Sequence, residues 1–338
     1  MAPDEPPAAA VREALTDATG SDPGEVRLRP VPGGASRQTF LVEGAGDGRW
    51  VLRRDPPGAQ SFLALEDEFQ VVRAAEAVGV PVPRLLSFEP EAGRFGSAGY
   101  LMEHVDGESV APRVLRRDEY AAARERLPAQ LAQALARIHS LEVPAELDSA
   151  LHGAFVAHTA SNAPNPGLAA CDFWERELDE VGEPLPAVEV GLRWLRLNAP
   201  APPDRSTLVH GDFRLGNFIV DANGLAAVID WELCHLGDSA EDVAWLCVRS
   251  WRFGNDDRPV AGLGGIDEFL DAYEAEGGTR PEPERLRWWG AMGNVKWAVI
   301  CARQAHDHLT GSRRSHELAS LGRRICEPEW DLLEAIAS

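Results

Sequence analysis

The sequence predicts an α+β protein with a small β-rich lobe at the N-terminal end and a larger helical lobe after it. Three observations lead to this fold class. The chain has 338 residues, more than a single small core usually needs, so two lobes are expected. Strand-like runs separated by glycine and proline fill much of the first third of the chain. Long amphipathic patterns typical of helices dominate the rest.

The small lobe is expected to begin with a helix and to continue with strands. The stretch AVREALTDATG predicts a helix that ends at Gly20. VRLRPVPGGASRQTFLVEGAGDGRWVLRRDPPG predicts strands separated by glycine turns, the last one stopped by Pro56 and Pro57. A helix with one apolar stripe is expected from Phe62 to Val78, and VPVPRLLSFEP and GYLMEHVDG are expected to be extended.

We expect the boundary between the lobes at the end of this last segment, near Val105 to Glu108. Residues 1–104 then form the N-terminal lobe and residues 105–338 the C-terminal lobe. In the second lobe, PAQLAQALARIHSL predicts a central amphipathic helix, and DANG followed by LAAVID predicts a β-hairpin. Long helical patterns follow at IDEFLDAYEAEG, ERLRWWGAMGNVKWAVICARQAHDH and SHELASLGRRICEPEWDLLEAI.

Composition restricts the possible partners and setting. The formal net charge of -21, with acidic residues spread throughout, argues against a nucleic-acid or anionic-membrane partner. Without a secretory signal or a CxxC pair, the five cysteines are expected to be reduced thiols of a cytoplasmic protein. No apolar run is long enough to span a bilayer. The sequence contains one lysine, Lys296, so any cation of the small lobe must be an arginine.

The stretch LVHGDFRLGNF places polar residues between apolar segments and has the spacing H-x-D-x-x-x-x-N. Four residues separate Asp212 from Asn217, and VIDWE brings Asp230 one short hairpin later. Phosphoryl transfer needs such a set: one carboxylate orients a hydroxyl and accepts its proton, while an amide oxygen and a second carboxylate hold Mg²⁺. The hairpin after Asn217 is expected to return Asp230 to the same cleft.

HGDFRLGN followed by VIDWE resembles the aminoglycoside phosphotransferase and choline kinase-like superfamily, which has a two-lobed protein-kinase-like fold. The resemblance extends from about PVPGGASRQTF to the end of the helical lobe. WVLRRDPPG, LVHGDFRLGNF and VIDWELCHLGD are most similar to bacterial phosphotransferases of poorly defined substrate and to the kinase-like part of some acyl-CoA dehydrogenase fusions. The resemblance implies Mg²⁺-dependent transfer of a phosphate from ATP or GTP to a hydroxyl of a small molecule.

The resemblance also implies roles for the matching residues. Asp212 is expected to be the catalytic base and His210 a structural member of its loop. Asn217 and Asp230 are expected to bind the metal. Asp238 is expected to cap the helix that follows it, while Glu232, Asp242 and Arg214 receive no definite role, Arg214 being equally well explained by a phosphate, a substrate or a surface ion pair.

On the nucleotide side, residues 1–104 are expected to bind the nucleoside triphosphate through a strand cation and a helix glutamate. Strand alternation puts Arg53 on the face of Val51 and away from Arg54, and choline kinase-like relatives have arginine at the matching place. At about 100° per residue, Glu68 lies inside the apolar stripe of its helix, so we expect it to pair with Arg53.

Two further segments are expected to contact the nucleotide. VPGGASRQTF would form the loop over the phosphates, with Ser36 as a donor and Arg37 and Gln38 as further candidates. YLMEHVDG occupies the place of the segment that joins the lobes, so backbone groups from Glu103 to Val105 would contact the edge of the base.

The acceptor site and the class of activity have rival interpretations. Acceptor-lining candidates, for each of which a structural role is favoured, are Asp271, Glu274, Glu276, Asp307, His308, Trp288, Trp289 and Trp297. The alternative function is that of a nucleotide-binding, pseudokinase-like regulatory protein, which has no need for Asp212, Asn217 and Asp230 together. A protein kinase is disfavoured, because HGD and IDWE replace HRD and DFG and no APE-ended segment is found.

Overall fold

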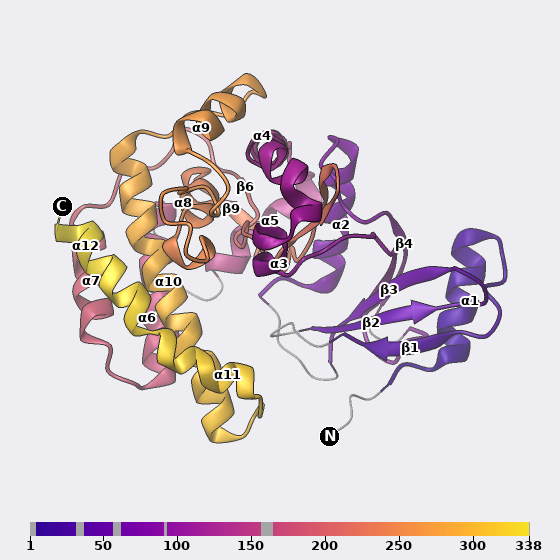
Figure 1. Ribbon diagram of the computed structural model, residues 1–338. Helices are drawn as coiled ribbons and strands as arrows, with labels where there is room; N and C mark the ends of the chain where they lie inside the picture. Colours follow the sequence, from indigo (N-terminus) through magenta and orange to yellow (C-terminus); the bar gives the residue numbers. More distant parts are fainter. Residues whose placement is uncertain (1–4, 32–36, 57–61, 91–92, 157–164, 338) are drawn as a thin grey trace.

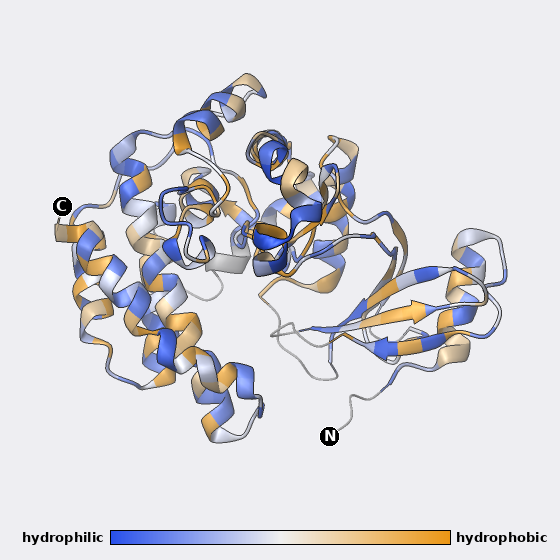
Figure 2. Cartoon of the chain, in the orientation of Figure 1, coloured by the Kyte–Doolittle hydropathy of each residue, from blue (hydrophilic) through white to orange (hydrophobic). Residues whose placement is uncertain are grey.

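The computed structural model describes residues 5–31, 37–56, 62–90, 93–156 and 165–337, and the side chains of residues 153–156 are not described. It confirms the predicted α+β class, with an antiparallel sheet in the N-terminal part and a larger helical part after it (Figure 1). Polar and apolar residues alternate along the helices and strands of both parts (Figure 2). No described helix is both long and apolar enough to cross a membrane.

The small lobe is a five-stranded antiparallel sheet in the order β1-β2-β3-β5-β4, with strands β1 (Arg27–Pro30), β2 (Gln38–Glu43), β3 (Arg49–Arg54), β4 (Leu85–Glu89) and β5 (Gly99–Glu103). Helix α1 (Ala8–Thr19) ends at Gly20, as predicted, in a left-handed cap. Its apolar face packs on Leu52 and Leu101 of the sheet. Helix α2 (Leu65–Ala77) contributes Phe69, which packs against Tyr100.

The chain leaves the small lobe at the end of β5. We propose the boundary between residues 104 and 105, just after this strand. Glu108 then exchanges two backbone hydrogen bonds with Val220 of the large lobe, at 2.9 and 3.0 Å. Three elements follow in sequence: α3 (Ala111–Arg116), η1 (Asp118–Tyr120) and the central helix α4 (Ala121–Ser140).

The large lobe is built from helices around two short antiparallel strand pairs. Its remaining helices are α5 (Ala145–Val156), α6 (Pro166–Val181), α7 (Pro186–Leu197), α8 (Ala240–Leu246), η2 (Arg249–Trp251), α9 (Ile266–Ala275), α10 (Pro283–Thr310), α11 (His316–Leu321), η3 (Gly322–Arg324) and α12 (Cys326–Ala337). The strand pairs are β6 (Thr207–Val209) with β9 (His235–Gly237), and β7 (Phe218–Asp221) with β8 (Gly224–Val228).

Two apolar cores hold this lobe together. The larger core surrounds the buried face of α4 and includes residues of α8, α9 and the short strands. The second joins α6, α7, α10 and α12, which lie beside one another in Figure 1. Arg53, Asp212, Asn217 and Asp230 line one cavity, to which α8 and α10 also contribute residues.

The last helical pattern differs from the prediction. Instead of one continuous helix, the segment forms α11, the short η3 turn and α12. Gly322 is a poor helix former, and Pro328 lies in the first turn of α12, where its missing amide N–H costs no intrahelical hydrogen bond. Both residues therefore favour a break and a restart over one long helix.

Candidate active site

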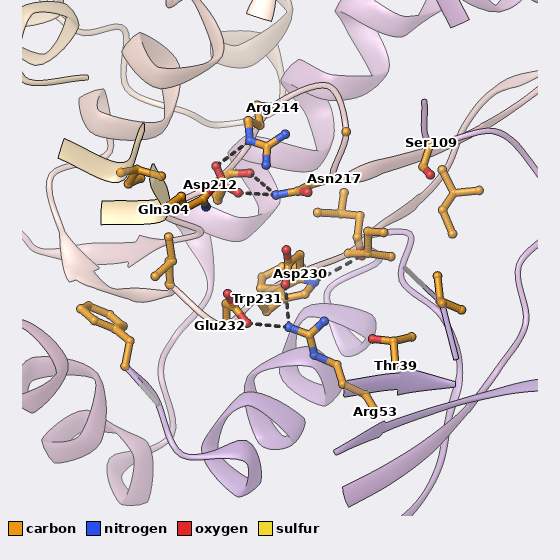
Figure 3. Close-up of a pocket in the computed structure, with 18 of the residues that line it drawn as sticks. Thr39, Arg53, Ser109, Asp212, Arg214, Asn217, Asp230, Trp231, Glu232 and Gln304 are labelled. Atoms are coloured by element: carbon orange, nitrogen blue, oxygen red, sulfur yellow. Dashed lines mark hydrogen bonds and ion pairs between the residues drawn. The ribbon is translucent and has the colours of Figure 1, made fainter. Parts of the chain in front are cut away.

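The HGD segment begins where β6 ends and turns sharply at Gly211. Gly211 has a φ of 79°, and a Cβ atom added there would lie 2.3 Å from the carbonyl oxygen of Leu233. Only glycine fits a left-handed backbone this close to another chain segment. The turn points Asp212 into the space between the lobes (Figure 3).

Three donors hold the carboxylate of Asp212. Its Oδ1 accepts hydrogen bonds from Nε1 of Trp245 at 2.8 Å and from Nε of Arg214 at 2.9 Å. Its Oδ2 accepts a bond from Nδ2 of Asn217 at 2.6 Å. Because both oxygens are engaged, the direction of the carboxylate is set before any ligand arrives (Figure 3). The contact between Arg214 and Asp212 also shows that Arg214 forms an ion pair inside the pocket, rather than on the surface.

The backbone of the loop is held from below by Asp242, for which the sequence indicated no definite role. Its carboxylate accepts the amide N–H of His210 at 2.7 Å and that of Gly211 at 2.9 Å. It also lies 3.2 Å from Nε2 of His139. Burial alone raises the pKa of Asp242, but the hydrogen bonds from His139 and His210 leave this pKa below its ordinary value. Asp242 is therefore a buried, charged support of the loop.

His210 is fully buried beside Trp231, at 4.7 Å between ring centroids. Its Nδ1 accepts the amide N–H of Asp212 at 3.2 Å. Burial lowers the pKa of His210, so the ring is neutral at pH 7. These contacts fit the structural part that the sequence analysis expected for this histidine.

The hairpin of β7 and β8 brings Asp230 back beside Asn217. The carbonyl of Asn217 accepts the amide N–H of Ile229 at 2.9 Å, one residue before Asp230. Asp230 itself has a φ of 67°, a left-handed conformation that costs a non-glycine residue about 1–3 kcal/mol and is characteristic of functional positions. Both side chains line the pocket of Asp212 (Figure 3).

The donor atoms of Asn217 and Asp230 suit Mg²⁺. The Asn217 bonds to Asp212 both use its Nδ2, at 2.6 and 3.0 Å, which orients its amide oxygen away from Asp212. Within the described part of the chain there is no group of three or more His, Cys, Asp or Glu that could hold a metal. Mg²⁺ accepts such a sparse set, because it commonly takes one or two protein oxygens and completes its shell with phosphate and water.

Arg53 crosses from β3 to the large lobe. Its Nη2 donates to Asp230 at 2.6 Å and to Glu232 at 3.0 Å (Figure 3). On the small-lobe side, its Nε lies 3.1 Å from the carboxylate of Glu68. Burial alone raises the pKa of Asp230, but the Arg53 charge leaves it below its ordinary value, so Asp230 is a carboxylate at pH 7.

The ion pair expected between Arg53 and Glu68 is present, and Glu68 has further partners. Its buried carboxylate also contacts the guanidinium of Arg37 and accepts the hydroxyl of Tyr100 at 2.8 Å. Arg54 faces the other side of the sheet, where it bonds Gln38 and the carbonyl of Phe95, both at 2.8 Å. Arg53 is therefore the member of the arginine pair that faces the pocket.

Ser36 lies outside the described residues, so the structure makes no statement about it. Glu103 and Val105 line the pocket at the junction of the lobes. The carboxylate of Glu103 points to Arg84, at 3.0 Å, which leaves the backbone as its contribution to the pocket wall. Val105 lies two residues after the end of β5, so its backbone lies beyond the paired part of the sheet.

A cavity of about 1250 Å³ connects these residues. The small-lobe wall includes Val51, Arg53 and Met102, and the opposite wall carries Asp212, Asn217 and Asp230. Beyond Asp212 the cavity continues to a wall made by α6, α10 and α11. Its lining there comprises Phe173, Trp174, Glu177, Glu180, Trp251, Trp297, Ile300, Arg303, Gln304, Asp307, Arg313, Leu318 and Leu321.

Among the acceptor candidates of the sequence, only Asp307 and Trp297 line this cavity. Trp288 and Trp289 are core residues, each 2% exposed, as favoured in the sequence analysis. The other candidates are occupied elsewhere: Asp271 and Glu274 pair with Arg280, Glu276 with Arg137, and His308 accepts the amide of Ser315.

Glu232 lines the site, whereas Asp238 lies outside it. Asp238 accepts the amide N–H of Ala240 at 3.0 Å, as expected at the start of α8, although Ser239 is the formal N-cap. It also binds Trp289 and Arg285 and is thereby part of the core. Glu232 lines the pocket and pairs with Arg53.

Sequence reasoning missed several residues around Asp212. Trp245 and Lys296 lie on α8 and α10, where tryptophan and lysine at helical spacing look like core and surface residues. Gln304 and Arg303, one turn or more further along α10, gave no signal either. Trp245 reaches Asp212 from α8, Lys296 reaches the HGD loop from α10, and Arg303 and Gln304 line the same cavity. These are tertiary contacts, and no local pattern encodes them.

Comparison with known proteins agrees with this geometry. Residues 27–289 match the model of the phosphotransferase enzyme family. Acyl-CoA dehydrogenase family member 10 of Mus musculus is 30% identical over an alignment of 326 residues that covers 91% of this chain and 29% of that protein. The chain spans 28–37% of the length of the first curated relatives that it matches.

Two solved structures show the same fold. A Ralstonia eutropha protein, provisionally described as an aminoglycoside phosphotransferase, has a TM-score of 0.70 and 21% identity, over 96% of this chain and 98% of that one. Spectinomycin phosphotransferase, solved with ADP and spectinomycin, has a TM-score of 0.62 and 12% identity, over 98% of both chains. The predicted two-lobed, protein-kinase-like fold is confirmed. The family match over most of its length shows that the chain belongs to the phosphotransferase enzyme family.

Proposed function

We propose that the protein is a small-molecule kinase that transfers the γ-phosphate of ATP or GTP to an alcohol hydroxyl, with Mg²⁺. The observation that carries this proposal is the convergence of Asp212, Asn217, Asp230 and Arg53 on one cavity between the lobes. ADP bound to the similar spectinomycin phosphotransferase supports a nucleoside triphosphate as the donor.

Asp212 is the proposed catalytic base. It orients the acceptor hydroxyl, whose oxygen forms a bond to the γ-phosphorus while the bond from that phosphorus to the bridging oxygen of the nucleoside diphosphate breaks. The hydroxyl proton passes to the Asp212 carboxylate. Asn217 and Asp230 would hold Mg²⁺, which neutralises charge on the phosphates when bound.

The small lobe is the proposed nucleotide-binding lobe. Arg53 would exchange its contacts with Asp230 and Glu232 for phosphate oxygens and remain anchored on Glu68. The backbone of Glu103 and Val105 would contact the base, and Ser36 the phosphates. Residues 105–338 would supply catalysis and the acceptor site, and the cytoplasm, with its reduced thiols, is the proposed setting; all five cysteines are free.

The cavity wall made by α6, α10 and α11 indicates which kinds of acceptor could bind. Glu180 and Glu177 there lie 3.0 and 3.5 Å from Arg303, and Asp307 lies 3.8 Å from Arg313. Together with Glu317, which also lines this wall, these acids outnumber the two arginines that pair with them, so the charge of the wall is compatible with a cationic acceptor such as an aminoglycoside. Tryptophans and aliphatic residues, among them Trp297 and Ile300, make the same wall partly apolar. Since similar proteins are named acyl-CoA dehydrogenase family members, hydroxyacyl compounds belong among the acceptors to be tested.

The test is phosphate transfer from labelled ATP and GTP, with Mg²⁺, across hydroxyacyl compounds, sugars, choline, macrolides and aminoglycosides. Asp212→Ala is the catalytic control. Asp221→Asn, at the turn of the β7–β8 hairpin, is the matched control. A product made by the wild type and Asp221→Asn but not by Asp212→Ala supports the proposal. Tight binding of Mg²⁺–nucleotide without transfer to any acceptor would instead favour the alternative, a pseudokinase-like regulatory protein.

A further inference from the structure

Lys296, the only lysine of the chain, is buried in the middle of α10 and only 4% exposed. A buried ammonium is costly unless charged and hydrogen-bonding partners surround it. Lys296 has such partners: its Nζ donates to the carbonyl of Gly211 and lies 3.5 Å from Oε1 of Glu241. Its Nζ also lies 4.5 Å from the ring centroid of Trp245. The lysine therefore lies beneath the HGD loop with a carbonyl, a carboxylate and an indole ring around its Nζ.

The contact with Gly211 acts on the peptide bond that leads into Asp212. The carbonyl of this peptide accepts from Lys296, and its N–H donates to Nδ1 of His210 at 3.2 Å. The preceding peptide N–H is bound by Asp242 at 2.9 Å. A peptide plane held at both its oxygen and its nitrogen cannot rotate without breaking a buried hydrogen bond. Lys296 thus restricts the backbone that aims the Asp212 side chain.

The contact with Trp245 acts on the side chain of Asp212 directly. The indole under the ammonium donates its Nε1–H to Oδ1 of Asp212 at 2.8 Å. A cation on the ring face fixes the orientation of that ring. Lys296 therefore contacts both groups that direct Asp212: the Gly211–Asp212 peptide and the indole of Trp245.

A compact ammonium suits this position better than a guanidinium. The chain uses arginine for every other basic side chain except histidine, and Lys296 is only 5% exposed as a side chain. An ammonium can direct its three protons to an oxygen, a carboxylate and a ring within a small volume, while a planar guanidinium requires a wider, flatter space.

We propose that Lys296 is a positioning residue for phosphoryl transfer, which sets the direction of the Asp212 carboxylate through Gly211 and Trp245. This inference rests on the proposed phosphotransfer function. It goes beyond that function in assigning a role to a helix that carries none of the catalytic or metal-binding residues.

The kinetic test compares Lys296→Met with Arg287→Met. Arg287 is a matched control, because it lies on the same helix and contacts a tryptophan ring, that of Trp194, but is exposed. Turnover, measured as Mg²⁺-dependent ATP hydrolysis and as transfer to any acceptor found, is divided by the number of nucleotide-binding sites, so that unfolded protein does not count. For Lys296→Met we expect kcat to fall about 10- to 100-fold with the ATP KM within about threefold of wild type. Arg287→Met should keep the wild-type kcat.

A double-mutant cycle separates positioning from general stabilisation. Trp245→Phe removes the indole N–H but keeps a ring, and it should lower kcat by itself. If both residues act through Asp212, the double variant should lose little more than the worse single variant. Lys296→Arg should not restore kcat. Multiplicative losses, restoration by arginine, or an unchanged kcat in Lys296→Met would each overturn the proposal.

A spectroscopic test works without turnover and leaves Lys296 itself unchanged. With one lysine in the chain, ¹⁵Nζ-lysine labelling yields a single side-chain resonance. We expect a slowly exchanging ammonium signal that shifts in Asp212→Asn and in Trp245→Phe. A rapidly exchanging signal, or one insensitive to both substitutions, would overturn the role of Lys296. If the wild type transfers no phosphate at all, the proposed function fails, and this measurement still tests the coupling of Lys296 to Asp212.

Discussion

The two halves of the candidate site are held in different ways. The HGD loop is fixed through its backbone, because Asp242 binds the amides of His210 and Gly211 and Lys296 binds the next carbonyl. The small-lobe half is fixed mainly through side chains, in a cluster of ion pairs that includes Arg53 and Glu68. Within the described residues, Arg53 also joins the two halves, through Asp230 and Glu232.

This difference indicates which half changes when ligands bind. Backbone hydrogen bonds buried under a loop are rarely exchanged, so the direction of Asp212 is set in advance. Side-chain ion pairs exchange partners readily, and phosphate oxygens offer Arg53 the same fork-shaped contact as a carboxylate. We therefore expect the base to be preorganised and the nucleotide side to rearrange, with Arg53 releasing Asp230 for the metal.

The largest effect is expected for Asp212→Ala, the substitution that removes the base from the rigid half. Transfer should fall at least about 10³-fold, the scale of a lost general base. Binding of Mg²⁺–ADP, measured by calorimetry, should stay within about threefold of wild type, because Asn217, Asp230 and Arg53 remain. Retained turnover would show that Asp212 is not the catalytic base and that the rigidly held HGD loop does not carry the catalytic group.

Asp230→Ala tests the metal side of the same cavity. Without this carboxylate, nucleotide affinity should lose its dependence on Mg²⁺, with a loss of about 10- to 100-fold at saturating metal. Asp221→Asn, in the turn of the same hairpin, is the control and should bind like the wild type. Titrations in which Mg²⁺ still tightens nucleotide binding to Asp230→Ala would count against the metal assignment.

Arg53→Ala and Arg54→Ala test the exchangeable half. Arg53 faces the cavity, so its loss should weaken ATP binding about tenfold, the scale of a charge-assisted contact. Arg54 faces the other side of the sheet, and its loss should change ATP affinity by less than about threefold while lowering thermal stability. Equilibrium binding and thermal unfolding of both variants provide the comparison. A larger loss of affinity in Arg54→Ala would refute the assigned face.

The smallest expected effect is a pH dependence of stability that comes from Asp242. Its pKa is lower in the folded protein than the ordinary value, so its stabilisation is present above that ordinary value, near pH 4, and is lost as the pH falls toward the folded pKa. Between pH 5 and pH 3 the wild type should therefore lose more of its unfolding free energy than Asp242→Asn does. Urea unfolding at several pH values measures both. Parallel curves for the two proteins would show that Asp242 does not support the loop as a charge.

Much of the fold and of the central motif was predictable, because local rules encode both. Gly20 ends α1 where the pattern stops, and the DANG turn closes the hairpin of β7 and β8. Strand alternation correctly separated Arg53 from Arg54, and helical periodicity placed Glu68 on the buried face toward Arg53. Each of these follows from a period or a turn that a few neighbouring residues specify.

The acceptor side was much less predictable. Asp271, Glu274 and Glu276 looked as suitable as Asp307 in the sequence, yet only Asp307 lines the cavity. Charge and periodicity show that a residue lies on a helix face, but the neighbour of that face depends on how the helices cross. The same reason hid Gln304 and Arg303, which reach the cavity because α10 passes both the HGD loop and α6.

The sequence by itself determined the chemical groups of the site and their order: Arg53, Glu68, Asp212, Asn217 and Asp230, on strands, a helix and a hairpin that local patterns specify. The tertiary structure decided how those groups are supported. It put Asp242, Trp245 and Lys296 against one loop from two different helices. Buried polar groups must find partners wherever the packed core brings them, so these contacts belong to the assembled fold and to no single segment of the chain.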